Sequence, residues 1–224
     1  FLYFAAVLGM HLSRFAEELV LWSTTAFGFV RLADSVTTGS SIMPQKRNPD
    51  IAELVRGKSG RLYGNLVSLL TTMKGLPLTY NRDMQEDKEP LFDAADQLAG
   101  SLRMARAVVE SAKLNPEKTA AAAGQSWVIA TDLAEELSRE GIPFHRAHQI
   151  VGRLVLESVR AGKRPSDWTP EQLAAFAPEL KPGMARLLRP EEGMRTRELP
   201  GGTGPRSVAQ ALEEAGKRLD AMRA

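Results

Sequence analysis

The sequence has 224 residues, and 43% of them are hydrophobic, which is enough to bury a sizeable core in one long body with an appendage. Its 29 basic and 27 acidic side chains give a formal net charge of +2 and are interleaved along the chain, so a nucleic-acid-binding stripe is excluded. The absence of cysteine excludes disulfide and thiolate chemistry, and no uncharged apolar stretch reaches the roughly 18 residues of a membrane span. We therefore expect a soluble, cytoplasmic protein.

A helix is predicted from Phe1 to about Ala26. Its apolar residues recur at helical spacing as Phe4, Leu8, Leu12, Phe15, Leu19 and Trp22. The chain opens inside this helix without a cap, and its first residue is Phe rather than Met, so we expect further sequence upstream.

Residues 27–48 break the helical pattern with glycines, serines and Pro44, which predicts a loop long enough to carry function. A second helix then begins, with Asn48 as the expected N-cap and Pro49 at the first helical position. Gly57, Gly60 and Gly64 lie three or four residues apart in it. Each costs about 1 kcal/mol relative to alanine in a helix, so we expect another helix to approach them closely.

A polar loop with the sequence NRDMQEDKE precedes a third helix, from Leu91 through Val109. Three helices of about 25 residues, each roughly 37 Å long, predict an elongated bundle.

Shorter helices are expected after Asn115-Pro116, over about 117–123, 127–140, 144–161, 170–177 and 205–223. Gly141 and Gly162 stand where helix C-caps are expected, and Thr169 with Gln172 fits a capping box. Residues 182–204 are compatible with a loop or with a small hairpin. The change from long to short helices predicts a domain boundary near residue 112.

The most informative segment is GSSIMPQKRNP, from Gly39 to Pro49, which leads into a helix N-terminus. It places Lys46 and an amide beside exposed backbone N–H groups at the positive end of the helix dipole, an arrangement that favours an anionic ligand such as a carboxylate. The residues alone also allow a simpler interpretation, in which Gly39 and the serines form a flexible turn and Asn48-Pro49 is an ordinary helix cap.

This segment resembles the Gly-Ser-Ser-x-Met-Pro-x-Lys-x-Asn signature of the fumarase, aspartase and argininosuccinate lyase superfamily. Gln45 and the continuation Asn48-Pro49-Asp50 resemble argininosuccinate lyases in particular. Further stretches share the resemblance, namely HLSRFAEELVLW, LPLTYNRDMQEDKEPLFD, ATDLAEEL, GIPFHRAHQIVG and GGTGPRSVAQAL. The resemblance covers essentially the whole chain and implies cleavage of argininosuccinate to arginine and fumarate.

The resemblance implies a role for several residues of the signature loop, 38–49. Ser40 would be the general base that removes a proton next to a succinyl carboxylate. Lys46 and Asn48 would contact the carboxylate end of the substrate, and Ser41 would also bind substrate. Glu53 resembles a carboxylate that pairs with a family histidine, although a first-turn helix acid would explain it equally well.

Three residues of the polar loop, Tyr80, Gln85 and Lys88, match substrate-binding positions of argininosuccinate lyases. Without the resemblance they would be interpreted as part of a solvated, charged loop. The histidines His11, His145 and His148 match no catalytic histidine of the family and lack further metal ligands, so we predict neither a metal nor a cofactor.

The resemblance implies an all-α fold with a fumarase/aspartase-type long-helix bundle over residues 1–111 and a small helical C-terminal domain over 112–224. It also implies a homotetramer whose sites are shared between subunits. The upstream Ser-x-x-Asn-Asp and Thr-His motifs of the family do not occur here, so this chain alone is expected to be inactive. Two alternatives are another fumarate-releasing lyase, of the adenylosuccinate lyase or aspartase type, and a crystallin-like structural protein without activity.

Overall fold

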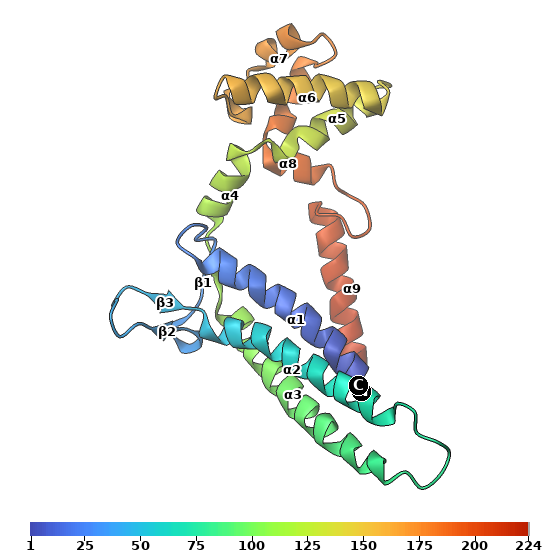
Figure 1. Ribbon diagram of the computed structural model, residues 1–224. Coiled ribbons are helices and arrows are strands. Elements are labelled where there is room, and N and C mark those ends of the chain that lie inside the picture. The colour runs from blue at the N-terminus through green and yellow to red at the C-terminus, as the bar shows by residue number, and fades with distance from the viewer. Residues whose placement is uncertain (224) are drawn as a thin grey trace. The chain divides into compact units, whose positions relative to one another are not determined.

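A computed structural model describes residues 1–223, and helices dominate it, which confirms the predicted all-α class (Figure 1). The chain divides into two compact units, Phe1–Lys118 and Thr119–Ala224. The boundary that the composition suggests near residue 112, and the independence of the two domains, stay predictions. Within residues 1–223, no helix is both long and apolar enough to cross a lipid bilayer.

Three long helices build the first unit: α1 (Leu2–Ser23), α2 (Asp50–Met73) and α3 (Lys88–Ser111). Each packs against the next in antiparallel order, and α1 also contacts α3 (Figure 1). Their core contains Leu2, Ala5, Leu62, Ala94 and Leu98. The predicted bundle of long helices is therefore present.

The close helix approach that we predicted at Gly57, Gly60 and Gly64 is wrong within this chain. A Cβ atom added at any of the three would meet nothing within 4 Å, because they lie on the exposed side of α2. The tight contact is instead at Gly9 of α1, where an added Cβ would lie 2.6 Å from Cδ1 of Leu62. Gly9 thus lets α1 pack closely against α2.

Two short antiparallel ribbons complete the unit. β1 (Val30–Arg31) pairs with β4 (Lys113–Leu114), and β2 (Thr38–Gly39) pairs with β3 (Arg47–Asn48). A 3₁₀ helix, Asp34–Val36, lies between β1 and β2, and another, Arg82–Asp87, precedes α3. Leu19, Val30, Leu32, Val36 and Val108 form a buried cluster that holds the first of these 3₁₀ helices against α1 and α3.

The second unit consists of short helices that match the predicted ones within a few residues. The α-helices from α4 onward are α4 (Pro116–Gln125, which begins in the first unit), α5 (Ala130–Arg139), α6 (Phe144–Arg160), α7 (Pro170–Phe176), α8 (Pro190–Arg195) and α9 (Pro205–Arg223). Short 3₁₀ helices cover Trp127–Ile129, Pro165–Asp167 and Pro182–Leu188. Residues 182–195 are therefore largely helical, and both alternatives, a loop and a small hairpin, are wrong for them.

Sequence signals at the helix ends of this unit are confirmed. Gly141 and Gly162 follow α5 and α6 with φ of +94° and +64°, a conformation that glycine adopts without strain. Thr169 Oγ1 accepts from Gln172 N at 3.3 Å, and Gln172 Oε1 accepts from Thr169 N at 3.2 Å, which completes the capping box.

Candidate active site

The predicted signature loop precedes the N-terminus of α2 and forms a small ribbon with a seven-residue tip (Figure 1). Thr38 pairs with Asn48 and Gly39 pairs with Arg47, so the tip comprises residues 40–46. Its second half is a turn in which Lys46 N donates to Met43 O at 3.0 Å, with Pro44 at the second position, where its fixed φ suits a turn. The second half of the tip is therefore a hydrogen-bonded turn.

Ser40 begins the tip, and its side chain organises the first half. Its Oγ accepts hydrogen bonds from Ile42 N at 3.2 Å and from Met43 N at 3.1 Å. Two backbone N–H dipoles thus point at one hydroxyl oxygen, as in the turns that serine commonly stabilises. The same dipoles would stabilise negative charge on that oxygen if its proton were lost.

Ser41 and Lys46 are exposed on the tip, and Ser40 and Asn48 are half-buried. Among residues 1–223 we find no carboxylate within ion-pairing distance of Lys46 Nζ. The ammonium group is thus available to an anionic ligand. The predicted N-cap, Asn48, is wrong: its backbone belongs to the ribbon, and Pro49 occupies the N-cap position of α2 without a side-chain cap.

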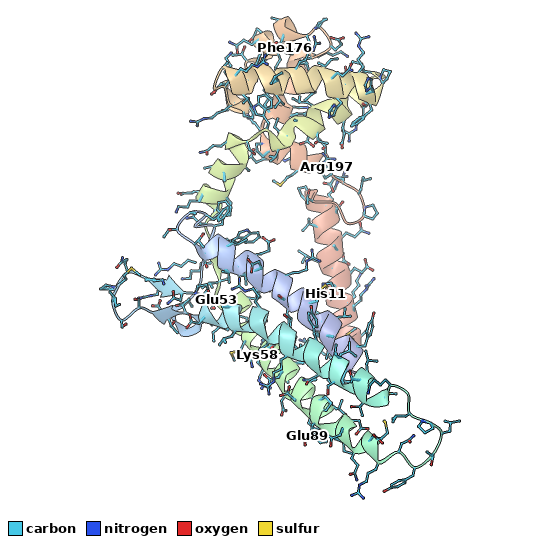
Figure 2. All side chains as sticks on the ribbon, in the orientation of Figure 1. His11, Glu53, Lys58, Glu89, Phe176 and Arg197 are labelled. Atoms are coloured by element: carbon cyan, nitrogen blue, oxygen red, sulfur yellow. The ribbon has the colours of Figure 1, made fainter. Side chains whose placement is uncertain are left out.

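The first turn of α2 carries Asp50 and Glu53. Asp50 Oδ2 accepts from Thr38 Oγ1 at 2.5 Å, which joins the ribbon to the helix. Glu53 is exposed at the ribbon end of α2 (Figure 2). Its charge adds slightly to the raised pKa of Arg56, which is due mainly to the hydrogen bond between Arg56 and Glu17. Glu53 thus lies at the end of α2 from which the signature loop extends.

The other predicted substrate-binding residues lie at the opposite end of α2, in the turn that leads to α3 (Figure 1). Tyr80 is 82% exposed. Gln85 Oε1 accepts from Arg82 Nε at 3.3 Å, and Lys88 Nζ lies 2.7 Å from Asp87 Oδ1. Because α2 has 24 residues, it separates the two groups by roughly 36 Å. One copy of this chain therefore does not bring all predicted site residues together.

The three histidines are exposed. His11 lies on α1 (Figure 2). His145 and His148 lie on α6, where the ring of His145 is 3.0 Å from the amide nitrogen of Gln149. In the described part of the chain, no three His, Cys, Asp or Glu side chains are grouped to hold a metal ion. The expected lack of a metal or cofactor stays a prediction.

Sequence reasoning missed the contacts that hold the ribbon in place. Besides the bond between Thr38 and Asp50, Arg47 Nε donates to Asp34 Oδ1 at 3.2 Å. Asp34 lies 13 residues before Arg47, and nothing in helical or strand periodicity links the two.

Two family models match the chain: a lyase family over residues 1–64, and the C-terminal region of argininosuccinate lyase over residues 127–195. The chain is 65% identical to the argininosuccinate lyase of Solibacter usitatus, over 98% of its own length and 48% of that protein. It is 48% identical to the argininosuccinate lyase of Carboxydothermus hydrogenoformans, with the same coverage of both. The chain thus spans about half the length of the curated relatives it matches.

Solved structures are also similar to this chain. An EDDS lyase in complex with formate superposes with a TM-score of 0.89 at 28% identity, over 99% of this chain and 46% of that one. A class II fumarase from Schistosoma mansoni, at 22% identity, gives a TM-score of 0.62 over 71% of this chain and 32% of that one. The latter is a likeness of fold alone.

Proposed function

Because this chain belongs to the argininosuccinate lyase family, we propose that it contributes the signature-loop part of an enzyme that splits argininosuccinate into arginine and fumarate. The observation that carries the proposal is the geometry at Ser40, whose Oγ accepts from two backbone N–H groups in the same seven-residue tip as Lys46. The strong similarity to argininosuccinate lyases supports this substrate over those of other fumarate-releasing lyases.

In the proposed reaction, Ser40 acts as the general base. A serine hydroxyl is a poor base unless its alkoxide is stabilised, and the N–H groups of Ile42 and Met43 are placed to do this. The alkoxide removes the proton from the carbon next to one succinyl carboxylate. The electron pair left on that carbon spreads into the carboxylate, where Lys46 and Asn48 stabilise the growing charge.

The elimination is completed when the bond from carbon to the guanidino nitrogen breaks. The electron pair of the carbanion forms the double bond of fumarate, and the nitrogen leaves with the electrons of the broken bond and is protonated to give arginine. We assign Glu53 to the leaving-group side, paired with a residue from the upstream segment that the longer relatives contain. Ser41, Tyr80, Gln85 and Lys88 would bind the substrate.

We propose that sites are shared between subunits, and the separation of the two groups along α2 supports this. A second copy of α2, packed antiparallel to the first, would place the Tyr80 turn of one copy near the Ser40 loop of another. The exposed side of α2 suits such packing, because Leu54, Val67 and Leu70 are each more than half exposed there. The open glycines on α2 would allow close contact. We propose a homotetramer, located in the cytoplasm, in keeping with the lack of cysteine.

Fumarate release, followed by ultraviolet absorbance, tests the proposal. We expect no turnover of argininosuccinate by this chain alone, and turnover once it is mixed with the upstream half of the Solibacter relative. In that mixture Ser40→Ala should lower kcat by about 10²–10⁴-fold or more while the helical circular dichroism is unchanged. Retained activity of Ser40→Ala would refute its role as base.

The alternatives predict different results in the same assay. Turnover of adenylosuccinate or aspartate in preference to argininosuccinate would indicate another lyase of the superfamily. A folded tetramer that turns over none of these substrates would indicate a structural, crystallin-like protein.

A further inference from the structure

Arg47, the residue between Lys46 and Asn48, has a side chain that bridges the signature loop and the body of the first unit. Its Nε donates to Asp34 Oδ1 at 3.2 Å, and its Nη1 lies 3.5 Å from the carbonyl oxygens of Pro44 and Lys46. One guanidinium group therefore contacts a carboxylate outside the signature loop and two carbonyl groups in the second half of the loop tip.

Asp34 is a firm point of attachment for this side chain. It begins the 3₁₀ helix Asp34–Val36, and Val36 and Leu32 are 5% and 7% exposed in the cluster with Leu19 and Val108. The backbone on either side of Asp34 is thus fixed by the core. The opposite strand is tied to α2 by the bond between Thr38 and Asp50. The two bonds hold both strands of the ribbon and leave residues 40–46 to project from it.

We propose that Arg47 is a positioning residue that acts through Lys46 and Ser40, with Asp34 as its anchor. Its role in folding is minor, because the side chains of Arg47 and Asp34 are 55% and 77% exposed and such pairs contribute little to stability. Its effect is instead on the second half of the loop tip, because it contacts the carbonyl groups of Pro44 and Lys46. Arginine suits the role because its planar group can donate in several directions at once, which a lysine ammonium on a flexible stem does less well.

The consequence for catalysis rests on the proposed function, whereas the consequence for loop order does not. The first test therefore uses this chain alone and measures amide solvent exchange by NMR. Its probes are the amides of Ile42, Met43 and Lys46, which form hydrogen bonds within the loop. The variants are Arg47→Gln, Asp34→Asn and the charge exchange Asp34→Arg with Arg47→Asp. The control is Arg106→Gln, which removes an exposed ion pair with Glu110 on α3.

We expect Arg47→Gln and Asp34→Asn to speed exchange at the three loop amides by about two- to fivefold, the range that an exposed ion pair supports. The charge exchange should leave loop exchange fast, because a carboxylate at position 47 cannot donate to the carbonyl groups of Pro44 and Lys46. Arg106→Gln should leave the loop unchanged. Amides of α2 should exchange at the same rate in every variant, which shows that the fold is intact. Loop exchange that is unchanged in Arg47→Gln, or equally fast in Arg106→Gln, would overturn the proposal.

The second test uses the enzyme reconstituted with the upstream half. Arg47→Gln should lower kcat/KM about three- to thirtyfold, because small misplacement of reacting groups is costly, and Arg47→Lys should fall between it and the wild type. Unchanged kcat/KM alongside faster loop exchange would overturn the positioning role. If the wild-type mixture is inactive, the proposed function fails, and the exchange data still decide whether Arg47 holds the loop.

Discussion

Mixing two inactive variants tests the shared site directly. Ser40→Ala removes the proposed base at one end of α2, and Lys88→Met removes a proposed substrate ligand at the other, roughly 36 Å away along 24 residues. If a site takes its Ser40 loop from one copy and its Lys88 turn from another, the two variants can complement each other. In tetramers that assemble at random from equal amounts, about a quarter of the sites would receive both intact parts.

The assay is fumarate release by the two variants, expressed together and reconstituted with the upstream half. We expect close to a quarter of the wild-type rate from the mixture and almost none from either variant alone. A matched control combines Ser40→Ala with Lys46→Met, which lie in the same loop, so every site would contain one damaged loop. Recovery in the control, or none in the first mixture despite mixed tetramers, would refute site sharing between copies.

Three further predictions concern the stability of the two units. Gly9→Ala should lower the free energy of unfolding by about 1–3 kcal/mol relative to Gly100→Ala. The reason is that a Cβ at position 9 meets Leu62, whereas a Cβ at position 100 meets nothing within 4 Å. Equal effects of the two substitutions in urea titrations would contradict the close contact. Arg197→Met should cost the second unit about 1–3 kcal/mol, since it leaves the largely buried Asp132 without its partner at 2.5 Å, and thermal unfolding would measure this. The pKa of Asp93 is lowered, mainly by the hydrogen bond from Arg61 and next by the one from Asn65. The ionised Asp93 side chain therefore stabilises the fold at a pH above its pKa in the unfolded chain. This stabilisation is lost as the pH falls through its lower pKa in the folded chain. The stability difference between wild type and Asp93→Asn should therefore be larger at pH 7 than below about pH 4, and a pH-independent difference would count against this.

The helices could be predicted from the sequence because their signals are local. The apolar spacing in α1 and α6, the glycines after α5 and α6, and the capping box at Thr169 each depend on residues within about one turn. Asn48 shows where local signals fail: it has the right side chain for an N-cap, but pairing with Thr38, ten residues earlier, determines its backbone.

Glycines and charges show the same limit. Gly9 and Gly60 look alike in a helical pattern, and only the packing of α1 on α2 makes one a contact and leaves the other open. Arg56 pairs with Glu17 across two helices, and Arg47 pairs with Asp34 across a ribbon. Such partners are chosen by tertiary structure. The signature loop could be recognised by its sequence, but the direction of its N–H groups toward Ser40 required the structure.

The position of the proposed base on a loop, immediately before a helix, follows from what each element can supply. Inside a helix, backbone N–H groups are already bonded to carbonyl groups four residues earlier, so they cannot also stabilise a serine alkoxide. A turn has unpaired N–H groups, and here two of them point at Ser40 Oγ. A turn alone is less rigid, and the bonds from Thr38 to Asp50 and from Arg47 to Asp34 fix its base to α2 and to the core. The arrangement thus combines free hydrogen-bond donors with a rigid attachment, which neither a helix nor an isolated loop would provide.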